Sequence, residues 1–204
     1  MKKILIGAAL ALALSGAAFA AATPDYVTKA VSDTVRPKAD TDRDALRLPA
    51  ETIAFAGVQP GMKVAELFPG GGYFTRMLSD VVGPSGHIYG IENAKWNDGS
   101  DAKVAAEPGH GNVSIQIVKF GEFNLPEKVD VFWITQNYHD LHIAKYGAVD
   151  MAAFNKHVFD SLKPGGTYFI LDHQANPGTT EADIENLHRI EKAQVIREVT
   201  AAGF

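Results

Sequence analysis

Residues 64–72 restrict what this chain can fold into more than any other part of the sequence. They read Val-Ala-Glu-Leu-Phe-Pro-Gly-Gly-Gly, so a short apolar run typical of a buried strand leads directly into three glycines. The residues that follow place apolar side chains on one face of a helix, at Phe74, Met77, Leu78, Val81 and Val82. Bare backbone between a strand and a helix lets a ligand approach the edge of a sheet closely, although a tight turn without a ligand gives the same pattern.

Strands and helices alternate through the rest of the chain. We expect further strands at residues 87–91, 113–118, 129–135 and 167–171, and helices at 149–162 and 191–202. A helix between Pro49 and Gly57 precedes the first strand, since proline favours a helix start and glycine a helix end. Strands separated by helices predict an α/β fold with an open, mostly parallel, Rossmann-like sheet and helices on both faces.

Composition and charge limit the classes of function. A chain of 204 residues with 46% hydrophobic content can bury one sizeable core, and its charged content of 21% is ordinary, so we expect a single folded domain. The formal net charge is −5, and no run of Lys and Arg is present. This charge argues against nucleic acid as a partner, because nucleic-acid binding depends on cationic surfaces.

Residues 1–20 have the pattern of a secretory signal peptide. Lys2 and Lys3 precede an apolar run at residues 4–14, and Ala18-Phe19-Ala20 supplies a small-x-small cleavage site. The run is short for a membrane span of ~20 residues, so we expect cleavage and no stable membrane anchor. The chain has no cysteine, which fits a periplasmic or secreted location.

Two glutamates follow predicted strands where a nucleoside could be bound. Glu92 ends the second strand and lies 22 residues beyond Gly70, a spacing at which a carboxylate can accept both ribose hydroxyls. Glu122 follows the third strand and can accept from an exocyclic adenine amine. The alternative for Glu92 is a solvated acid at a strand end, and the alternative for Glu122 is an ordinary acidic residue of a loop.

These features together resemble the class I S-adenosylmethionine-dependent methyltransferases. The resemblance rests on the strand-acid-glycine segment, Glu92, the Gly121-Glu122 turn and the Leu-Lys-Pro-Gly-Gly run at 162–166, in this order. Residues 49–204 are similar in particular to a bacterial, often exported group with Pro-Gly-Gly-Gly, Asn-Tyr-His-Asp and Asp-His segments. The resemblance implies S-adenosylmethionine as cofactor, with the methionine portion near Glu66, Gly70, Gly71 and Gly72, the ribose at Glu92 and the adenine at Glu122.

Other nucleotide-binding patterns fit less well. A nicotinamide-binding Gly-x-Gly-x-x-Gly would require a small residue where the chain has Thr75, and no P-loop Gly-Lys-Ser/Thr is present. The methyltransferase class also shows one departure here. Its usual acid-x-Gly-x-Gly-x-Gly has glycine where this chain has Phe68.

The Asn137-Tyr138-His139-Asp140 segment follows the fourth strand and should face the transferable methyl group. We predict His139 as a base that takes a proton from the acceptor and Asp140 as the residue that orients its imidazole. Asn137, Tyr138 and His173 are predicted to lie beside the methyl acceptor. The alternatives are a packed or surface His139 and an Asp140 that caps a helix.

Three further side-chain arrangements stay open. His139, Asp140, Asp172 and His173 could converge on a metal ion, but their spacing does not require one, and we assign no metal. Arg47 can close over a carboxylate or form an exposed salt bridge. His188 lies before the last helix, where solvation and substrate contact are both open.

The sequence therefore predicts an enzyme that transfers a methyl group from S-adenosylmethionine to an oxygen or nitrogen of a small molecule. The Pro-Pro-aromatic segment of nucleic-acid amino methylases is absent. An exported, non-catalytic binding protein with the same fold is the alternative.

The predicted domain organisation has three parts. Residues 1–20 form the signal peptide, residues 21–48 form an irregular arm with room for a short helix near residues 26–34, and residues 49–204 form the methyltransferase-like domain. The chain ends where the class usually adds an antiparallel strand pair. We therefore expect a C-terminally incomplete domain, without that pair and with an uncovered fifth strand.

Overall fold

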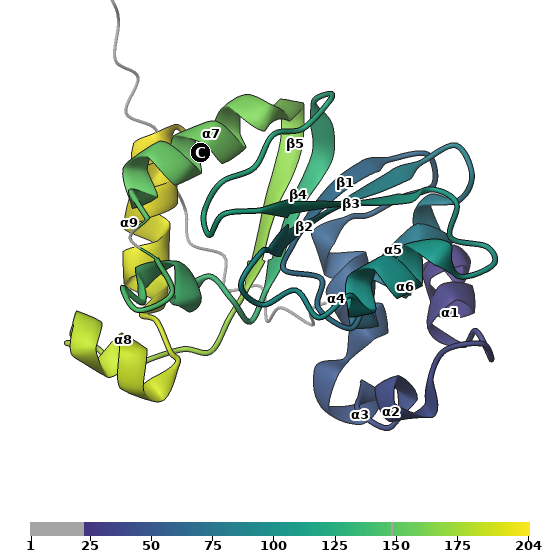
Figure 1. Cartoon of the computed structure of the whole chain (residues 1–204), viewed down its shortest axis with the longest axis horizontal. Coiled ribbons are helices and arrows are strands. Elements are labelled where there is room, and N and C mark those ends of the chain that lie inside the picture. The colour runs from purple at the N-terminus through teal and green to yellow at the C-terminus, as the bar shows by residue number, and fades with distance from the viewer. Residues whose placement is uncertain (1–22, 148) are drawn as a thin grey trace, which may run out of the picture.

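A sheet of parallel strands organises the structure, a computed structural model that describes residues 23–147 and 149–204. The predicted signal peptide lies outside the described residues. The five strands are arranged in the order β3-β2-β1-β4-β5 (Figure 1). Their bounds are Lys63–Leu67 for β1, His87–Asn93 for β2, Val113–Val118 for β3, Val129–Thr135 for β4 and Leu162–Leu171 for β5. The order reverses between β1 and β4, and ligands of such sheets bind beyond the carboxyl ends of the strands at this point.

Helices cover both faces of the sheet (Figure 1). Successive residues of a strand point into different apolar clusters. In β1, Val64 packs in one cluster and Ala65 in the other; in β4, Trp133 packs with Val64 and Phe132 with Ala65. Both faces are therefore buried, as in sheets of α/β proteins. The helices are α1 (Asp25–Val31), α4 (Pro49–Ala56), α5 (Tyr73–Val82), α6 (Ser100–Ala106), α7 (Met151–Ser161), α8 (Glu181–Leu187) and α9 (Lys192–Ala202).

The predicted α/β fold class is confirmed. All pairings between the five strands are parallel, and the described residues contain no antiparallel strand pair after β5. The chain instead forms α8 and α9 there, and α9 packs beside α7 (Figure 1). None of the helices in the described part of the chain is long and apolar enough to cross a membrane.

The N-terminal arm is more helical than the prediction, which allowed one short helix near residues 26–34. It contains α1 and two single-turn helices, α2 (Lys38–Thr41) and α3 (Asp44–Arg47). Val27 and Ala30 of α1 are buried in the core. Pro24 and Pro37 each immediately precede one of these helices. Proline is tolerated at a helix start because the first amides have no intrahelical partner.

Candidate functional site

The glycine loop leaves open space in front of β1. A side chain added at Gly70 or Gly71 would meet no atom within 4 Å, so bare backbone borders a free volume here. Gly72 has a different task, because a Cβ there would lie 2.4 Å from a methyl group of Val104. Two of the three glycines thus make room for a ligand, while the third allows α5 and α6 to approach each other.

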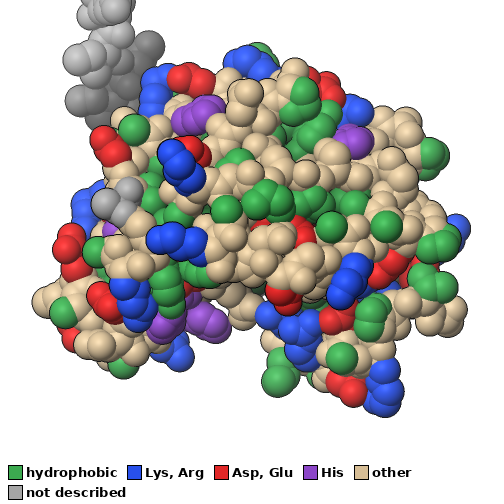
Figure 2. Space-filling view, viewed as in Figure 1, with side chains coloured by type: hydrophobic (Ala, Val, Ile, Leu, Met, Phe, Trp, Pro, Cys, Tyr) green, Lys and Arg blue, Asp and Glu red, His purple; other side chains and the backbone are tan. Residues whose placement is uncertain are grey.

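A cavity of about 190 Å³ lies beside this loop, between the carboxyl ends of β1 and β4. It is therefore placed at the reversal point of the sheet, as predicted. In the space-filling view the lower margin of the molecule is hollowed between the arm and the α8 region. Histidine side chains gather on the α8 side of this hollow and Lys or Arg side chains on the arm side (Figure 2). The cavity is lined by Arg43, Arg47, Glu66, Phe68, Pro69, Gly70, Gly71, Tyr73, Phe74, Thr135, Gln136 and Asn137.

Glu66 is the acidic group of this cavity. It is only 3% exposed, and its Oε2 atom has no hydrogen-bond partner among the described residues. Burial and, to a smaller extent, the negative charge of Glu92 raise the pKa of Glu66 to about 7. The Thr75 side chain acts in the opposite direction and lowers this pKa. A buried carboxyl oxygen without a partner is costly, so a cationic group that reached this cavity would be bound favourably.

Two arginines of the arm line the same cavity. The guanidinium groups of Arg43 and Arg47 lie over the ring of Tyr73, 4.9 Å and 4.6 Å from its centre. Arg47 Nη2 also donates to Gln136 Oε1 at 2.6 Å. Burial, reinforced by the charge of Arg43, lowers the pKa of Arg47. The cavity therefore offers both a carboxyl group and guanidinium groups, a combination that suits a zwitterion.

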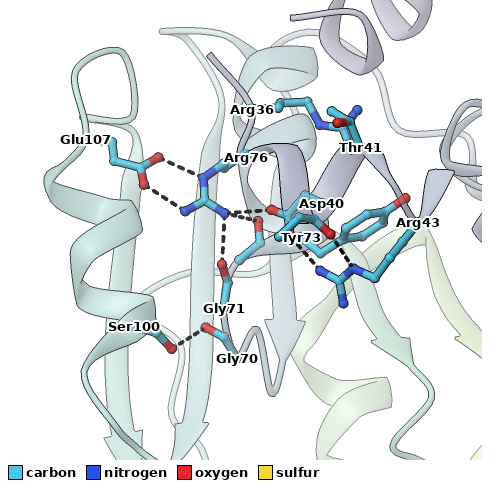
Figure 3. Close-up of polar contacts among 12 residues, drawn as sticks. Arg36, Asp40, Thr41, Arg43, Gly70, Gly71, Tyr73, Arg76, Ser100 and Glu107 are labelled. Atoms are coloured by element: carbon cyan, nitrogen blue, oxygen red, sulfur yellow. Dashed lines mark hydrogen bonds and ion pairs between the residues drawn. The ribbon is translucent and has the colours of Figure 1, made fainter. Parts of the chain in front are cut away.

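The loop is held in place by an ion-pair network around Arg76 (Figure 3). Arg76 donates to both carboxylate oxygens of Glu107, at 2.8 Å and 2.7 Å, and to Asp40 at 3.1 Å. Its Nη1 atom also donates to the carbonyl of Gly71 at 2.8 Å. A rigid guanidinium fork thus connects α5, α6, the arm and the loop, which fixes the backbone that borders the cavity.

Glu92 lies where the sequence predicted it, next to the glycine loop. It is 4% exposed, and its Oε2 accepts from Gly70 N at 3.1 Å while its Oε1 accepts from Asn93 N at 2.7 Å. Burial raises its pKa, although the two backbone bonds oppose this effect. The predicted pair of Gly70 and Glu92 is thus brought together by the neighbouring strands β1 and β2.

Glu122 is not brought to this cavity. Its side chain is 65% exposed and lies 3.9 Å from the ammonium of Lys119. It lines a separate cavity of about 440 Å³ together with Phe120 and His157. Neither Glu66 nor Glu92 lines this second cavity, so the assignment of Glu122 to the adenine stays a prediction.

An aromatic cluster of Phe68, Trp96, Phe120 and Tyr146 lies at the carboxyl edge of the sheet. Phe68 stacks on Phe120 with ring centres 5.4 Å apart and contacts Trp96 at 5.0 Å. The backbone of Phe68 has φ of +54°, so it keeps the left-handed conformation that glycine would adopt at this position. Phe68 therefore departs from the class pattern in its side chain, while its backbone conformation is one that glycine would also adopt.

His139 follows β4 and is the centre of a second polar group. It is 2% exposed, and its Nδ1 lies 2.7 Å from Asp172 Oδ1. The backbone amide of His139 donates to the other oxygen of Asp172 at 2.8 Å. The residue that orients this imidazole is thus Asp172, whereas the sequence assigned that task to Asp140.

Asp140 instead faces the other nitrogen of the ring. His139 Nε2 lies 3.3 Å from Asp140 Oδ1 and 3.2 Å from His188 Nδ1. Burial lowers the pKa of His139, but hydrogen bonds to Asp140 and Asp172 outweigh it and raise the pKa to about 9. Without another ligand, His139 is therefore protonated at neutral pH.

Tyr138 and His173, both predicted beside the acceptor, lie differently. The Tyr138 prediction is wrong, because this side chain is wholly buried, donates to Glu198 at 2.8 Å and accepts from Asn155 at 2.9 Å. The ring of His173 is exposed and its centre lies 6.4 Å from that of His139. Asn137 lines the cavity and donates to Asp140 Oδ2 at 2.8 Å, so it connects the two polar groups.

Unusual backbone conformations concentrate at this edge. Among the described residues, four that are not glycine have positive φ, and three of them, Phe68, Gln136 and His188, lie in or beside the site. Such conformations cost energy and persist where the surrounding structure enforces them, often at functional sites. Sequence reasoning missed the proximity of His188 to His139, because 49 residues separate them and no spacing rule connects them.

Comparisons with known proteins point to one fold. No family model matches this chain. It is 30% identical over 123 residues to a protein-L-isoaspartate O-methyltransferase of Hyperthermus butylicus, a match that covers 57% of this chain and 46% of that protein. The chain thus spans less than half the length of this relative.

Solved structures give the same answer. An S-adenosylmethionine-dependent methyltransferase from Aquifex aeolicus superposes with a TM-score of 0.64 at 20% identity, covering 79% of this chain and 82% of that one. An arsenic(III) S-adenosylmethionine methyltransferase from Chlamydomonas reinhardtii has a TM-score of 0.59 at 16% identity, covering 88% and 62%. At these identities the likeness concerns the fold.

Proposed function

Because this chain has the fold of the class I S-adenosylmethionine-dependent methyltransferase superfamily, we propose that it binds S-adenosylmethionine and transfers its methyl group to a small molecule. The observation that carries this proposal is the buried, unpaired carboxyl oxygen of Glu66 beside the guanidinium groups of Arg43 and Arg47. The acceptor atom is an oxygen or a nitrogen.

The donor's amino-acid end fits the charges of the cavity. Its ammonium would take the unpaired Glu66 oxygen, and its carboxylate would take Arg47 in place of Gln136. A volume of about 190 Å³ is below the ~300 Å³ at which sites for whole small ligands begin. We therefore assign this cavity to the methionine portion alone.

The ribose is assigned to Glu92. This carboxylate already accepts from Gly70, so it lies at the loop where open space adjoins the backbone. Ribose hydroxyls can donate to the same oxygens, and a carboxylate has lone pairs for several donors. The adenine then extends towards the aromatic cluster and the loop of Glu122, whose carboxylate is exposed.

Methyl transfer from a sulfonium needs positioning of the two reactants more than covalent help from the protein. S-adenosylmethionine, when bound, supplies the electrophilic methyl group. Asn137 lines the donor cavity and holds Asp140, so the acceptor would lie between Asn137 and the group around His139. A base role for His139 stays a prediction, because its ring must first lose the proton that Asp140 and Asp172 stabilise.

We also propose that the protein is exported, on the strength of the charged, apolar and small-residue segments of residues 1–20. A small-molecule acceptor fits the net charge of −5 better than a nucleic acid does.

Isothermal titration calorimetry with S-adenosylmethionine and S-adenosylhomocysteine tests the donor site. We expect one molecule to bind per chain and Glu92→Ala to abolish the binding. Glu181→Gln, an exposed glutamate of α8, is the matched control and should bind like the original chain. No binding to a folded sample would refute the donor site and favour the non-catalytic alternative. Methyl release to an added acceptor would establish the enzyme.

A further inference from the structure

Three side-chain atoms form a small triangle beyond the end of β4. His139 Nε2 lies 3.2 Å from His188 Nδ1 and 3.3 Å from Asp140 Oδ1, and His188 Nδ1 lies 3.3 Å from Asp140 Oδ1. The three residues come from two segments that are far apart in the sequence. Within the described residues, this is the one group of three such side chains whose ligand atoms gather so closely.

The spacing of the triangle is that of ligands around one ion. For bonds of about 2.1 Å, neighbouring ligand atoms lie about 3.0 Å apart in octahedral geometry and about 3.4 Å apart in tetrahedral geometry. All three observed separations fall between these limits. Two imidazole nitrogens and a carboxylate oxygen on one side of an ion also leave further positions open.

Neighbouring side chains hold the ligand atoms in position. Asp172 contacts the Nδ1 atom of His139, which leaves Nε2 for the centre of the triangle. Asn137 donates to Oδ2 of Asp140, which leaves Oδ1 for the centre. Such partners are typical of metal sites, where a carboxylate fixes the tautomer and raises the basicity of a ligating histidine.

We infer that His139, Asp140 and His188 bind a divalent transition-metal ion through these three atoms. Imidazole suits zinc, iron and cobalt better than it suits magnesium or calcium, which prefer oxygen ligands. The ion is therefore of the zinc-like class. His139 and Asp140 are almost fully buried, whereas His188 is 44% exposed, so an ion can enter from the side of His188.

The place of the ion suggests its task, a step that rests on the proposed function. Asn137 belongs both to the donor cavity and to the group that holds Asp140. An acceptor oxygen bound to the ion would therefore lie next to the donor's methyl group. The ion would lower the pKa of that oxygen, a task that His139 cannot perform as a base once its Nε2 is a ligand.

Metal binding can be tested without any donor or acceptor. The chelator-treated chain is titrated with Co²⁺ and followed by visible absorption, and Zn²⁺ affinity is measured by calorimetry. We expect one ion per chain with a Co²⁺ spectrum typical of nitrogen and oxygen ligands. His188→Gly should lower the affinity roughly 100-fold, and Asp172→Asn about 10- to 100-fold. The matched control is His157→Gln, at an exposed histidine elsewhere, which should bind like the original chain.

The main variant is expected to fold. His188 has φ of +50°, which glycine adopts without strain, so His188→Gly removes the imidazole and suits the backbone. Equal Co²⁺ affinity of the original chain and His188→Gly, or no binding by the folded original chain, would overturn the inference. Because no methyltransferase activity is measured, failure here leaves the donor site untouched, and failure of donor binding leaves the metal site untouched.

Discussion

Replacing Glu66 by glutamine should change how the stability of this protein depends on pH. The pKa of Glu66 is about 7 in the folded state, against its ordinary value of 4.5, which applies to the unfolded chain. Between these values the unfolded chain releases a proton that the folded chain keeps, so the free energy of unfolding falls as the pH rises. The stability that the protonated form provides is fully present below pH 4.5 and lost as the pH rises through 7.

The size of the effect follows from the shift, since one pKa unit corresponds to about 1.4 kcal/mol. Relative to low pH, the titration of Glu66 should therefore lower the free energy of unfolding by about 3 kcal/mol at pH 8 and by less than about 1 kcal/mol at pH 5. Glutamine has nearly the same shape and no charge. We expect Glu66→Gln to be close to the original chain in stability at pH 5 and more stable by about 2–3 kcal/mol at pH 8.

Urea unfolding at pH 5, 6, 7 and 8 measures this difference directly, because titrating groups that do not interact with Glu66 contribute equally to both proteins. Glu181→Gln serves as control and should show a difference near zero at every pH. A Glu66→Gln difference that stays constant from pH 5 to 8 would refute the burial of an unpaired carboxyl at this position. It would also remove the reason to place a donor ammonium there.

Three further predictions concern packing around the cavity. Gly71→Ala should fold normally but weaken S-adenosylhomocysteine binding in calorimetry, since its methyl group enters the free volume. Gly72→Ala should instead lower stability by about 1–3 kcal/mol in urea unfolding, because of backbone strain and contact with Val104. Equal behaviour of the two variants in both assays would contradict this. Tyr138→Phe should cost about 1–3 kcal/mol of stability and leave S-adenosylhomocysteine affinity unchanged, and a loss of affinity at unchanged stability would return Tyr138 to the site. Arg76→Met should lower stability by about 3–5 kcal/mol, because Asp40 and Glu107 lose a buried partner, and an effect below about 1 kcal/mol would show that the arm is held by apolar packing alone.

The sequence was most informative where function depends on neighbouring strands. Gly70 and Glu92 could be paired in advance because parallel strands connected by one helix bring their carboxyl ends together. The same logic placed Asn137 and His139 at the end of β4. It could not predict that the Tyr138 side chain faces the core, because successive residues of the turn after β4 point in different directions, some to the site and some to the core.

Contacts that depend on long loops could not be predicted. His188 reaches His139 only through the path of the chain between β5 and α9, which no local pattern encodes. The two single-turn helices of the arm could not be predicted, because such short helices depend on tertiary contacts. Here these contacts include the ion pair of Arg76 with Asp40 and the burial of Val27 in the neighbouring α1. The left-handed backbone of Phe68 was equally hidden, since phenylalanine rarely adopts it.

A crystal structure of the chain with S-adenosylhomocysteine tests the central claim most directly. We predict an ammonium group within hydrogen-bond distance of Glu66 Oε2 and ribose hydroxyls on the carboxylate of Glu92, with Gly70 and Gly71 against the ligand. A ligand bound elsewhere, or a Glu66 oxygen that stays without a partner beside a bound ligand, would contradict the account.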